Sequence, residues 1–314
     1  MPYTDLITRD DASALIPEEV SREIFQELPK ASAALSMFPH VTMSRKQQRL
    51  PVLSVLPFAY FRNGDTGLVQ TSKLEWANKY LNAEEVTVVV PIPETVLSDS
   101  EFDMWGQAKP AIVEAAGAVI DGAVFFGTQR PETWGNSIVE GAVAAGSTFV
   151  RGSVPDQDLS VDISDTMALV ENDGYAISGF VARSGIQAGL RGLRDQNGGL
   201  IFQASLQAET PSSIYAKPVS YCETDYWDED AAELITGNFR KGLIGLRQDI
   251  SWKLFTEASY FDNAGNLVFN LAQQHMVALD LTIRLAWQVP NPVNRKNQDA
   301  ATRYPFAVML PAEP

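Results

Sequence analysis

The strongest pattern of apolar and polar positions lies in the last quarter of the chain. In the stretch MVALDLTIRLAWQV, at 276–289, every odd position is apolar. Successive side chains of a β-strand point to opposite faces, so this alternation predicts a strand with one buried face. Residues 243–255 alternate in the same way. A strand over 276–289 would span about 46 Å at roughly 3.3 Å per residue, far more than a typical strand of about five or six residues. The pattern therefore predicts an extended body.

A long helix is predicted in the first half of the chain. Apolar residues recur every three or four positions from 102 to 126, which is the spacing of one helical face. The preceding stretch SDSE at 98–101 fits a capping box, and Gly127 fits a helix terminator. Pro110 removes one backbone hydrogen bond, so we expect either a kink near 106–110 or two abutting helices.

Residues 47–76 predict an extended β-hairpin, with the turn sequence NGDTG of residues 63–67 at its tip. Pro51 and Pro57 fall on one side of its first strand, which places them on the unpaired edge of an outer strand. Both faces of that strand are apolar, so a protruding hairpin needs a partner to cover part of it. The candidate contact residues of the hairpin are Leu56, Phe58, Tyr60, Phe61, Asn63, Gly64 and Gly67.

The N-terminal region contains one amphipathic stretch, IPEEVSREIFQEL, which predicts a helix that Pro29 ends. Its apolar residues recur every four positions and are Ile16, Val20, Ile24 and Leu28. Residues 160–210 combine two helical patterns, SDTMALVEN and IQAGLRGLRD, with two strand patterns, GYAISGFVA and LIFQ. The middle of the chain is therefore expected to have α/β character.

Composition and charge narrow the possible functions. The chain has 314 residues and a formal net charge of −15, which disfavours tight binding of nucleic acid through its phosphates. Cys222 is the only cysteine, which excludes an internal disulfide and a zinc site made of several cysteines. We expect no secretory signal, because no basic start is followed by an apolar stretch. Glu114 and Asp121 interrupt the most apolar helical region, which argues against a membrane span.

Candidate catalytic residues are few. His40 and His275 lie in no metal-ligand spacing, and the common nucleotide-binding, hydrolase and zinc-protease motifs are absent from the sequence. We therefore predict no catalytic residue, metal or cofactor. One alternative stays open, because the acidic cluster ETDYWDED at 223–230 could serve a glycosidase that uses two carboxyl groups. In the structural interpretation, Asp228 or Asp230 caps a helix formed by AAELITGN, at 231–238.

Six stretches, in order along most of the chain, resemble the major capsid proteins of tailed bacteriophages with the Hong Kong 97-type fold. EEVTVVVPIPETVLSDSEFDMW resembles the strand, proline break and acidic cap before that family's spine helix, and DGAVFFGT resembles the end of that helix. GLRGLRDQNGGLIFQ is similar to a short helix, turn and strand of the family, and IYAKPVSYCE to its Pro-Val segment, although Ala216 stands where glycine is usual. ITGNFRKGLIGLRQDISWKLF and QQHMVALDLTIRLAWQVPNP, with the closing YPFAVML, are similar to its later strands.

The resemblance implies an α+β Hong Kong 97-type capsid fold. Its implied parts are an N-arm at 1–43, an extended hairpin called the E-loop at 44–82, a peripheral domain with the spine helix at 83–151, an axial domain at 152–235, and return strands of both domains at 236–314. Because the arm begins close to Met1, we expect a separate scaffolding protein, or none, rather than a cleaved N-terminal scaffold. The covalent cross-link of some relatives is not transferred to Lys73 or Lys79.

The implied function is that of a major capsid protein. Copies would assemble through pentamers and hexamers into an icosahedral shell that encloses the double-stranded DNA of a tailed phage without sequence-specific binding. E-loop residues would contact one neighbour, and the apolar N-arm residues another. Implied partners are a scaffolding protein, a portal and a decoration protein, with no membrane; the implied location is the virion capsid, assembled in the host bacterial cytoplasm. An encapsulin-type compartment shell, a tail tube subunit and the acidic-cluster hydrolase are the alternatives.

Overall fold

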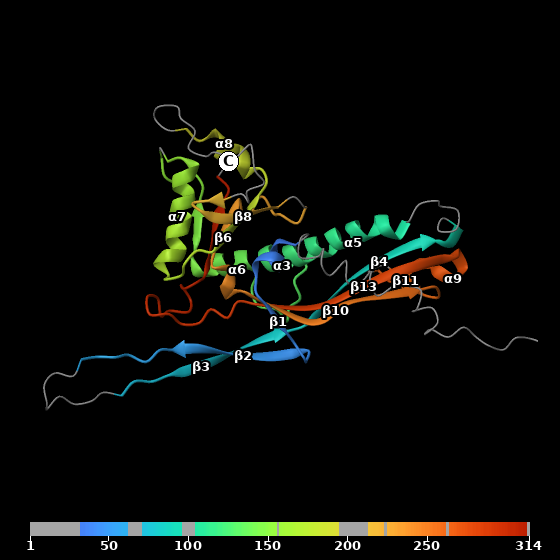
Figure 1. Cartoon of the computed structure of the whole chain (residues 1–314), viewed down its shortest axis with the longest axis horizontal. Coiled ribbons are helices and arrows are strands. Elements are labelled where there is room, and N and C mark those ends of the chain that lie inside the picture. The colour runs from blue at the N-terminus through green and yellow to red at the C-terminus, as the bar shows by residue number, and fades with distance from the viewer. Residues whose placement is uncertain are drawn as a thin grey trace, which may run out of the picture.

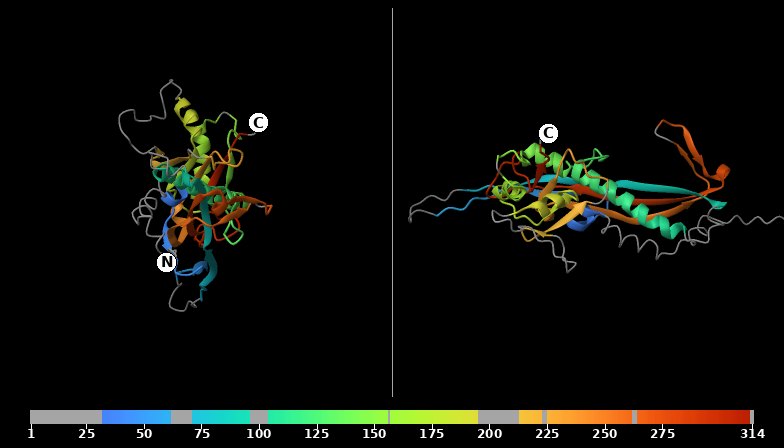
Figure 2. Two further views of the ribbon diagram at one scale, coloured as in Figure 1. Left: turned by 90° about the vertical axis from the view of Figure 1, so that its right-hand side faces the viewer. Right: turned by 90° about the horizontal axis from the view of Figure 1, so that it is seen from above.

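The computed structural model describes residues 32–61, 71–95, 104–155, 157–194, 213–222, 225–261 and 264–312, with the backbone alone for 104–109, 248–250 and 252. The chain is elongated (Figure 1). A β-hairpin leaves the body at one end, a long sheet with a helix along it reaches the other end, and a layer of helices and strands stands on the middle. Figure 2 shows, in its view from above, that the helix follows the length of the long strands.

The long sheet has four strands in the order β1, β10, β13 and β4. Their bounds are β1 His40–Thr42, β4 Glu84–Pro93, β10 Leu243–Phe255 and β13 Met276–Gln288. The predicted alternation of β13 is confirmed, because its odd residues are buried while Asp280, Thr282 and Arg284 between them are half-buried. β10 pairs antiparallel with β13 through two register shifts. Ile244, Leu246 and Leu254 nevertheless pack against one core, as predicted.

The predicted long helix is α5, Met104–Asp121, which continues directly into a π-helical turn at Gly122–Phe126. Gly127 ends it with a left-handed backbone at φ 80°, as predicted. A single helix runs through Pro110, so the alternative of two abutting helices is wrong. The predicted capping box at 98–101 lies outside the described residues.

The upper layer is a mixed sheet of six strands in the order β5, β14, β9, β6, β8 and β7. The strands are β5 Thr148–Val150, β6 Gly179–Arg183, β7 Ser213–Ile214, β8 Lys217–Cys222, β9 Leu234–Gly237 and β14 Phe306–Leu310. Three helices accompany it, α6 Ile138–Ala145, α7 Leu159–Asn172 and α8 Ile186–Gly192. The predicted α/β character of the middle of the chain is therefore confirmed for the described residues, whereas the strand predicted at LIFQ, 200–203, lies outside them and the domain boundaries stay predictions.

One secondary-structure prediction in this layer is wrong. Residues 231–238 do not form a helix, because 234–237 form β9, which lies between β14 and β6. Ala232, Leu234 and Ile235 are fully buried there. Ala, Glu and Leu favour helices in isolation, but burial on both faces of a sheet decides the conformation of this short segment.

An aromatic cluster joins the two layers. Phe38 directly follows the short helix α3, Ala33–Met37, and its ring lies 4.8 Å from Trp287 of β13 and 5.3 Å from Phe239. Phe239 begins a 3-10 turn, Phe239–Lys241, and also contacts Phe306 of β14. A second core lies between α7, α8 and the six-stranded sheet. The two main cores thus lie within the body, and a small third cluster packs Leu81, at the base of the hairpin, against Met43 and Ala286.

Candidate functional site

The protruding hairpin consists of β2, Gln47–Val55, and β3, Glu75–Asn82, paired antiparallel as predicted. Pro51 lies in β2, but Pro57 lies beyond its end at Val55, so the prediction that Pro57 belongs to the strand is wrong. Past this point the two arms of the hairpin run apart (Figure 1). Each arm leaves the paired region without a neighbouring strand among the described residues.

Large apolar side chains of the hairpin face solvent. Phe61 is fully exposed at 100%, Phe58 is 51% exposed, and Trp76 on β3 is 60% exposed. Tyr60, Leu74 and Tyr80 are exposed as well. Of the predicted contact residues, Leu56 is half-buried, and Asn63, Gly64 and Gly67 lie outside the described residues, as do Ile16, Val20, Ile24 and Leu28. An exposed apolar surface of this kind is a candidate for contact with another molecule.

The base of the hairpin is fixed firmly to the body. The indole N–H of Trp134 donates to the backbone oxygen of Asn82 at 3.0 Å, and the amide of Asn82 donates to the backbone oxygen of Thr133 at 2.8 Å. The amide of Gln288 donates to the backbone oxygen of Tyr80 at 3.2 Å. On the β2 side, Val293 N–H donates to the oxygen of Leu53 at 2.9 Å. These hydrogen bonds hold the hairpin at a defined angle to the body. No periodic pattern of the sequence singles out the residues that form them.

We expect the Trp134→Phe variant to loosen this base. It keeps most of the buried ring but loses the bond to Asn82, so the free energy of unfolding should fall by about 1 kcal/mol. Hydrogen exchange at residues 77–83 should accelerate, which mass spectrometry measures. The matched control is Trp76→Phe, because Trp76 is exposed; equal acceleration in both variants would contradict the role given to Trp134.

A second exposed apolar hairpin lies at the opposite end of the molecule, where it stands out in the right-hand view of Figure 2. It is formed by β11, Ser259–Phe261, and β12, Leu267–Asn270, and precedes the short helix α9, Leu271–Gln274. Phe261, Leu267 and Val268 are exposed. Sequence reasoning missed this surface because strands of three and four residues carry too few positions for a period to be visible.

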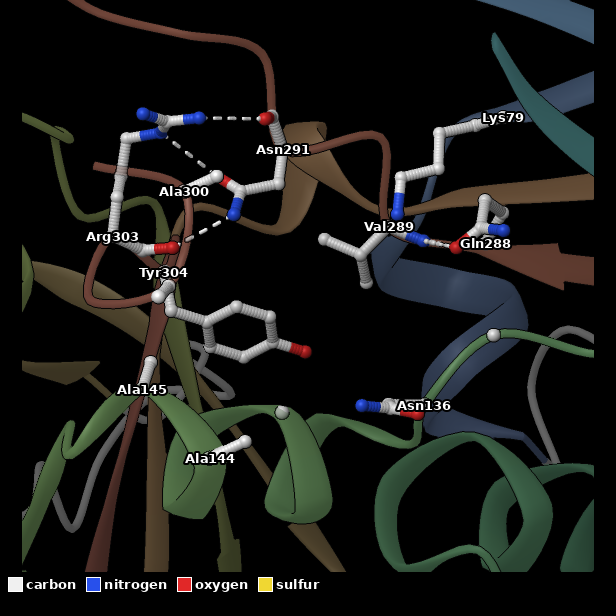
Figure 3. Close-up of a pocket in the computed structure, with 13 residues that line it drawn as sticks. Lys79, Asn136, Ala144, Ala145, Gln288, Val289, Asn291, Ala300, Arg303 and Tyr304 are labelled. Carbon is white, nitrogen blue, oxygen red and sulfur yellow. Dashed lines mark hydrogen bonds between the residues drawn. The ribbon is translucent and has the colours of Figure 1, made fainter. Parts of the chain in front are cut away.

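A cavity of about 440 Å³ lies beside the base of the β2–β3 hairpin (Figure 3). Lys79, the end of β13, α6 and the segment before β14 line it. The guanidinium of Arg303 donates to the side-chain oxygen of Asn291 at 3.2 Å and to its backbone oxygen at 3.1 Å. The Gln288 side chain accepts from the N–H of Val289 at 3.1 Å. These hydrogen bonds stabilise the walls of the cavity. The residues that line it include no acid–base pair suited to catalysis.

Two carboxylates of the acidic cluster at 225–230 make structural contacts. The carboxylate of Asp228 accepts from the N–H groups of Asp230 and Ala231, at 3.1 and 3.2 Å, and so caps a turn rather than the predicted helix. Glu229 pairs with Arg183 at 2.8 Å. Glu223 lies outside the described residues. Among the residues that the structure describes, no group of His, Cys, Asp and Glu is placed to hold a metal ion.

No helix in the described part of the chain is both long enough and apolar enough to cross a bilayer.

Comparison with known proteins gives consistent matches over nearly the whole chain. The model of the Phage capsid family matches residues 12–293. The major capsid protein of Staphylococcus phage 80alpha is 24% identical over 311 residues, which cover 98% of this chain and 89% of that protein. A solved structure from Microbacterium phage Oxtober96 has a TM-score of 0.78 and 36% identity, and covers 98% of this chain and 100% of its own. One from Mycobacterium phage Cain has a TM-score of 0.77 and 29% identity, with 98% and 99% covered.

Proposed function

The chain belongs to the phage capsid family and has its α+β Hong Kong 97-type fold, and we propose that copies of it assemble through pentamers and hexamers into the icosahedral shell of a tailed phage. Members of this family are structural proteins of the virion capsid rather than enzymes. The hydrolase, tail tube and encapsulin alternatives are not favoured, because the matching proteins are phage capsid proteins.

The observation that carries the proposal is the exposed aromatic surface on a hairpin whose base is fixed. Phe61 and Phe58 contribute nothing to the core of their own subunit, since both are exposed in it. On a neighbouring subunit each ring would remove apolar area from water, which stabilises the contact. A hairpin that reaches from one subunit onto a different surface of the next makes a heterologous contact, which generates closed rings when the rotation closes. We therefore propose that residues 44–82 are the E-loop.

The second exposed hairpin, β11–β12, supports contacts in more than one direction. Its exposed residues lie at the end of the molecule opposite the E-loop (Figure 1). A subunit held at both ends by different neighbours is released only when several contacts break together, so individually modest contacts give a durable shell. The N-arm residues Ile16, Val20, Ile24 and Leu28 are proposed to add a further contact.

The proposed contents and partners follow from the charge and from the family. A net charge of −15 is compatible with a shell that encloses double-stranded DNA without binding it tightly. The proposed partners besides other copies are a separate scaffolding protein, a portal and a decoration protein, with assembly in the host bacterial cytoplasm and no membrane involved.

Electron microscopy of the expressed chain tests the proposal. We expect closed shells, or pentamers and hexamers when the scaffolding protein is absent. Deletion of residues 57–72, which include the exposed rings of Phe58 and Phe61, should leave a folded subunit that forms no shell. Open filaments from the intact chain, or a monomer at every concentration, would contradict shell assembly. Normal shells from the deletion variant would contradict the E-loop assignment alone.

A further inference from the structure

A buried carboxylate at the end of α5 holds the beginning of the first described helix. Asp121 is only 1% exposed. Its Oδ1 accepts hydrogen bonds from the hydroxyl of Ser32 at 2.6 Å and from the backbone N–H of Ala34 at 2.9 Å, and its Oδ2 accepts from the N–H of Ala33 at 2.9 Å. All three donors belong to the start of α3, where residues 1–31 join the described fold. One side chain therefore fastens the root of the N-terminal segment to the long helix.

The surroundings of Asp121 compensate its charge with dipoles rather than with a cation. Tyr226, from the turn after β8, interacts with the carboxylate, and Cys222 at the end of β8 faces Tyr226 in turn. The ring of Tyr226 stacks on Phe125 of the π-helical turn, with the centroids 6.3 Å apart. From α3 the carboxylate meets Ser32 and backbone N–H groups alone. Among the described residues, no Lys or Arg contributes to the electrostatics of this carboxyl.

We propose that Asp121 and residues 32–34 form a pH-dependent latch, which holds the root of the N-terminal segment on α5 more firmly in mildly acidic than in neutral solution. The latch is a property of the single chain, so it stands independently of shell assembly. Its physical basis is the difference between a carboxyl group enclosed by protein and the same group in water.

The direction of the effect follows from proton linkage. Burial raises the pKa of Asp121 from its ordinary value of 3.8 to about 6, although its hydrogen bonds from Ser32, Ala34 and Ala33 act to lower it. When the latch opens, water reaches the carboxyl and its pKa returns toward the ordinary value. The closed latch thus binds the proton more tightly than the open one. The extra stability is fully present below pH 3.8 and is lost as the pH rises through about 6.

Protonation does not undo the contact itself. A neutral carboxyl group still offers oxygen lone pairs to the N–H groups of Ala33 and Ala34, and its own proton can be given to a hydroxyl such as that of Ser32. The pKa of Asp121 differs between the closed and the open latch. The equilibrium constant for opening should therefore change about tenfold between pH 5 and pH 8.

Hydrogen exchange of the full-length chain tests the latch. The measured quantity is the protection factor of the peptide 32–38, corrected for the intrinsic pH dependence of exchange, at pH 5 and pH 8, with the oligomeric state checked by light scattering. We expect about tenfold greater protection at pH 5 in the unmodified chain. The Asp121→Asn variant keeps a side-chain acceptor but cannot titrate, so it should lose the greater protection at pH 5. Any remaining pH dependence from His40, which contacts the backbone of Leu35, should have the opposite sign, because burial lowers the pKa of His40. Glu114→Gln, on the exposed face of the same helix, should behave like the unmodified chain.

A second variant separates titration from hydrogen bonding. Ser32→Ala removes one donor and leaves the carboxyl in place, so protection should be lower at both pH values. The ratio between them should be at least as large as in the unmodified chain, because the lost hydrogen bond acts to lower the pKa of Asp121. Equal protection of the unmodified chain at pH 5 and pH 8 would overturn the proposal. The same pH dependence in Asp121→Asn as in the unmodified chain would overturn it as well. If Asp121→Asn does not fold, the unmodified chain and Ser32→Ala decide the outcome.

Discussion

The double variant Phe58→Asp/Phe61→Asp is expected to form no closed shells and yet to fold normally. Both rings are exposed in the subunit, so their replacement removes little from its interior. On a neighbour, each buried aromatic ring contributes about 1.5–3 kcal/mol, and a buried carboxylate without a partner adds a further cost. A loss of about 3–6 kcal/mol weakens one contact roughly a hundredfold to ten-thousandfold. The same loss recurs at every subunit of the shell.

Electron microscopy and sedimentation measure shell formation, while circular dichroism and urea unfolding measure the subunit. The matched control is Val161→Asp on α7, because Val161 is also exposed but belongs to neither exposed hairpin. A single exposed apolar residue is ordinary on protein surfaces, so this control should assemble. Shells from the double variant at the usual concentration would show that these two rings are not contact residues. A marked loss of subunit stability would show instead that they belong to the fold.

The sequence was most informative where burial is periodic. The odd residues of β13 from Leu279 to Trp287 pack on the same core, so the burial of one face is visible in the sequence at every second position. The exposed hairpin was predicted for a related reason. Its first strand is apolar on both faces, and a single subunit cannot cover both faces of a protruding hairpin. The end of the long helix was predictable as well, because Gly127 adopts a left-handed backbone conformation there.

Features that depend on one contact between distant segments were not predictable. Asp121 looked like an interruption of an apolar helix, and only the fold shows that it meets Ser32, 89 positions earlier. Trp134 was not singled out from the sequence, although its N–H fixes the hairpin base at Asn82. The error at β9 has another origin. The local preference of its residues for helix is weak, and it is overridden when neighbouring strands bury the segment on both sides.

Trp287→Ala is expected to have the opposite effect to a change in the hairpin. Trp287 is fully buried, its ring packs edge-to-face on Phe38 at 4.8 Å, and its N–H donates to the backbone oxygen of Asn136 at 3.2 Å. The packing is close enough that a Cβ added at Gly242 would lie 2.8 Å from the indole. Alanine leaves a cavity and an unpaired carbonyl, so the free energy of unfolding should fall by about 3–5 kcal/mol, measured by urea unfolding of the unassembled subunit.

Trp76→Ala supplies the matched comparison, because it removes the same side chain from the exposed face of β3. Its effect on unfolding should stay within about 0.5 kcal/mol, while shell formation should weaken. Trp287→Ala should lose assembly only because folded subunits become scarce, so its defect should lessen under stabilising conditions such as added sulfate, which strengthens apolar burial. The Trp76→Ala defect should remain under those conditions, since the missing ring is absent from the contact however stable the subunit is. Equal losses of unfolding free energy in the two variants would mean that the hairpin and the core form one cooperative structure, and the separation of a folding surface from an assembly surface would not hold.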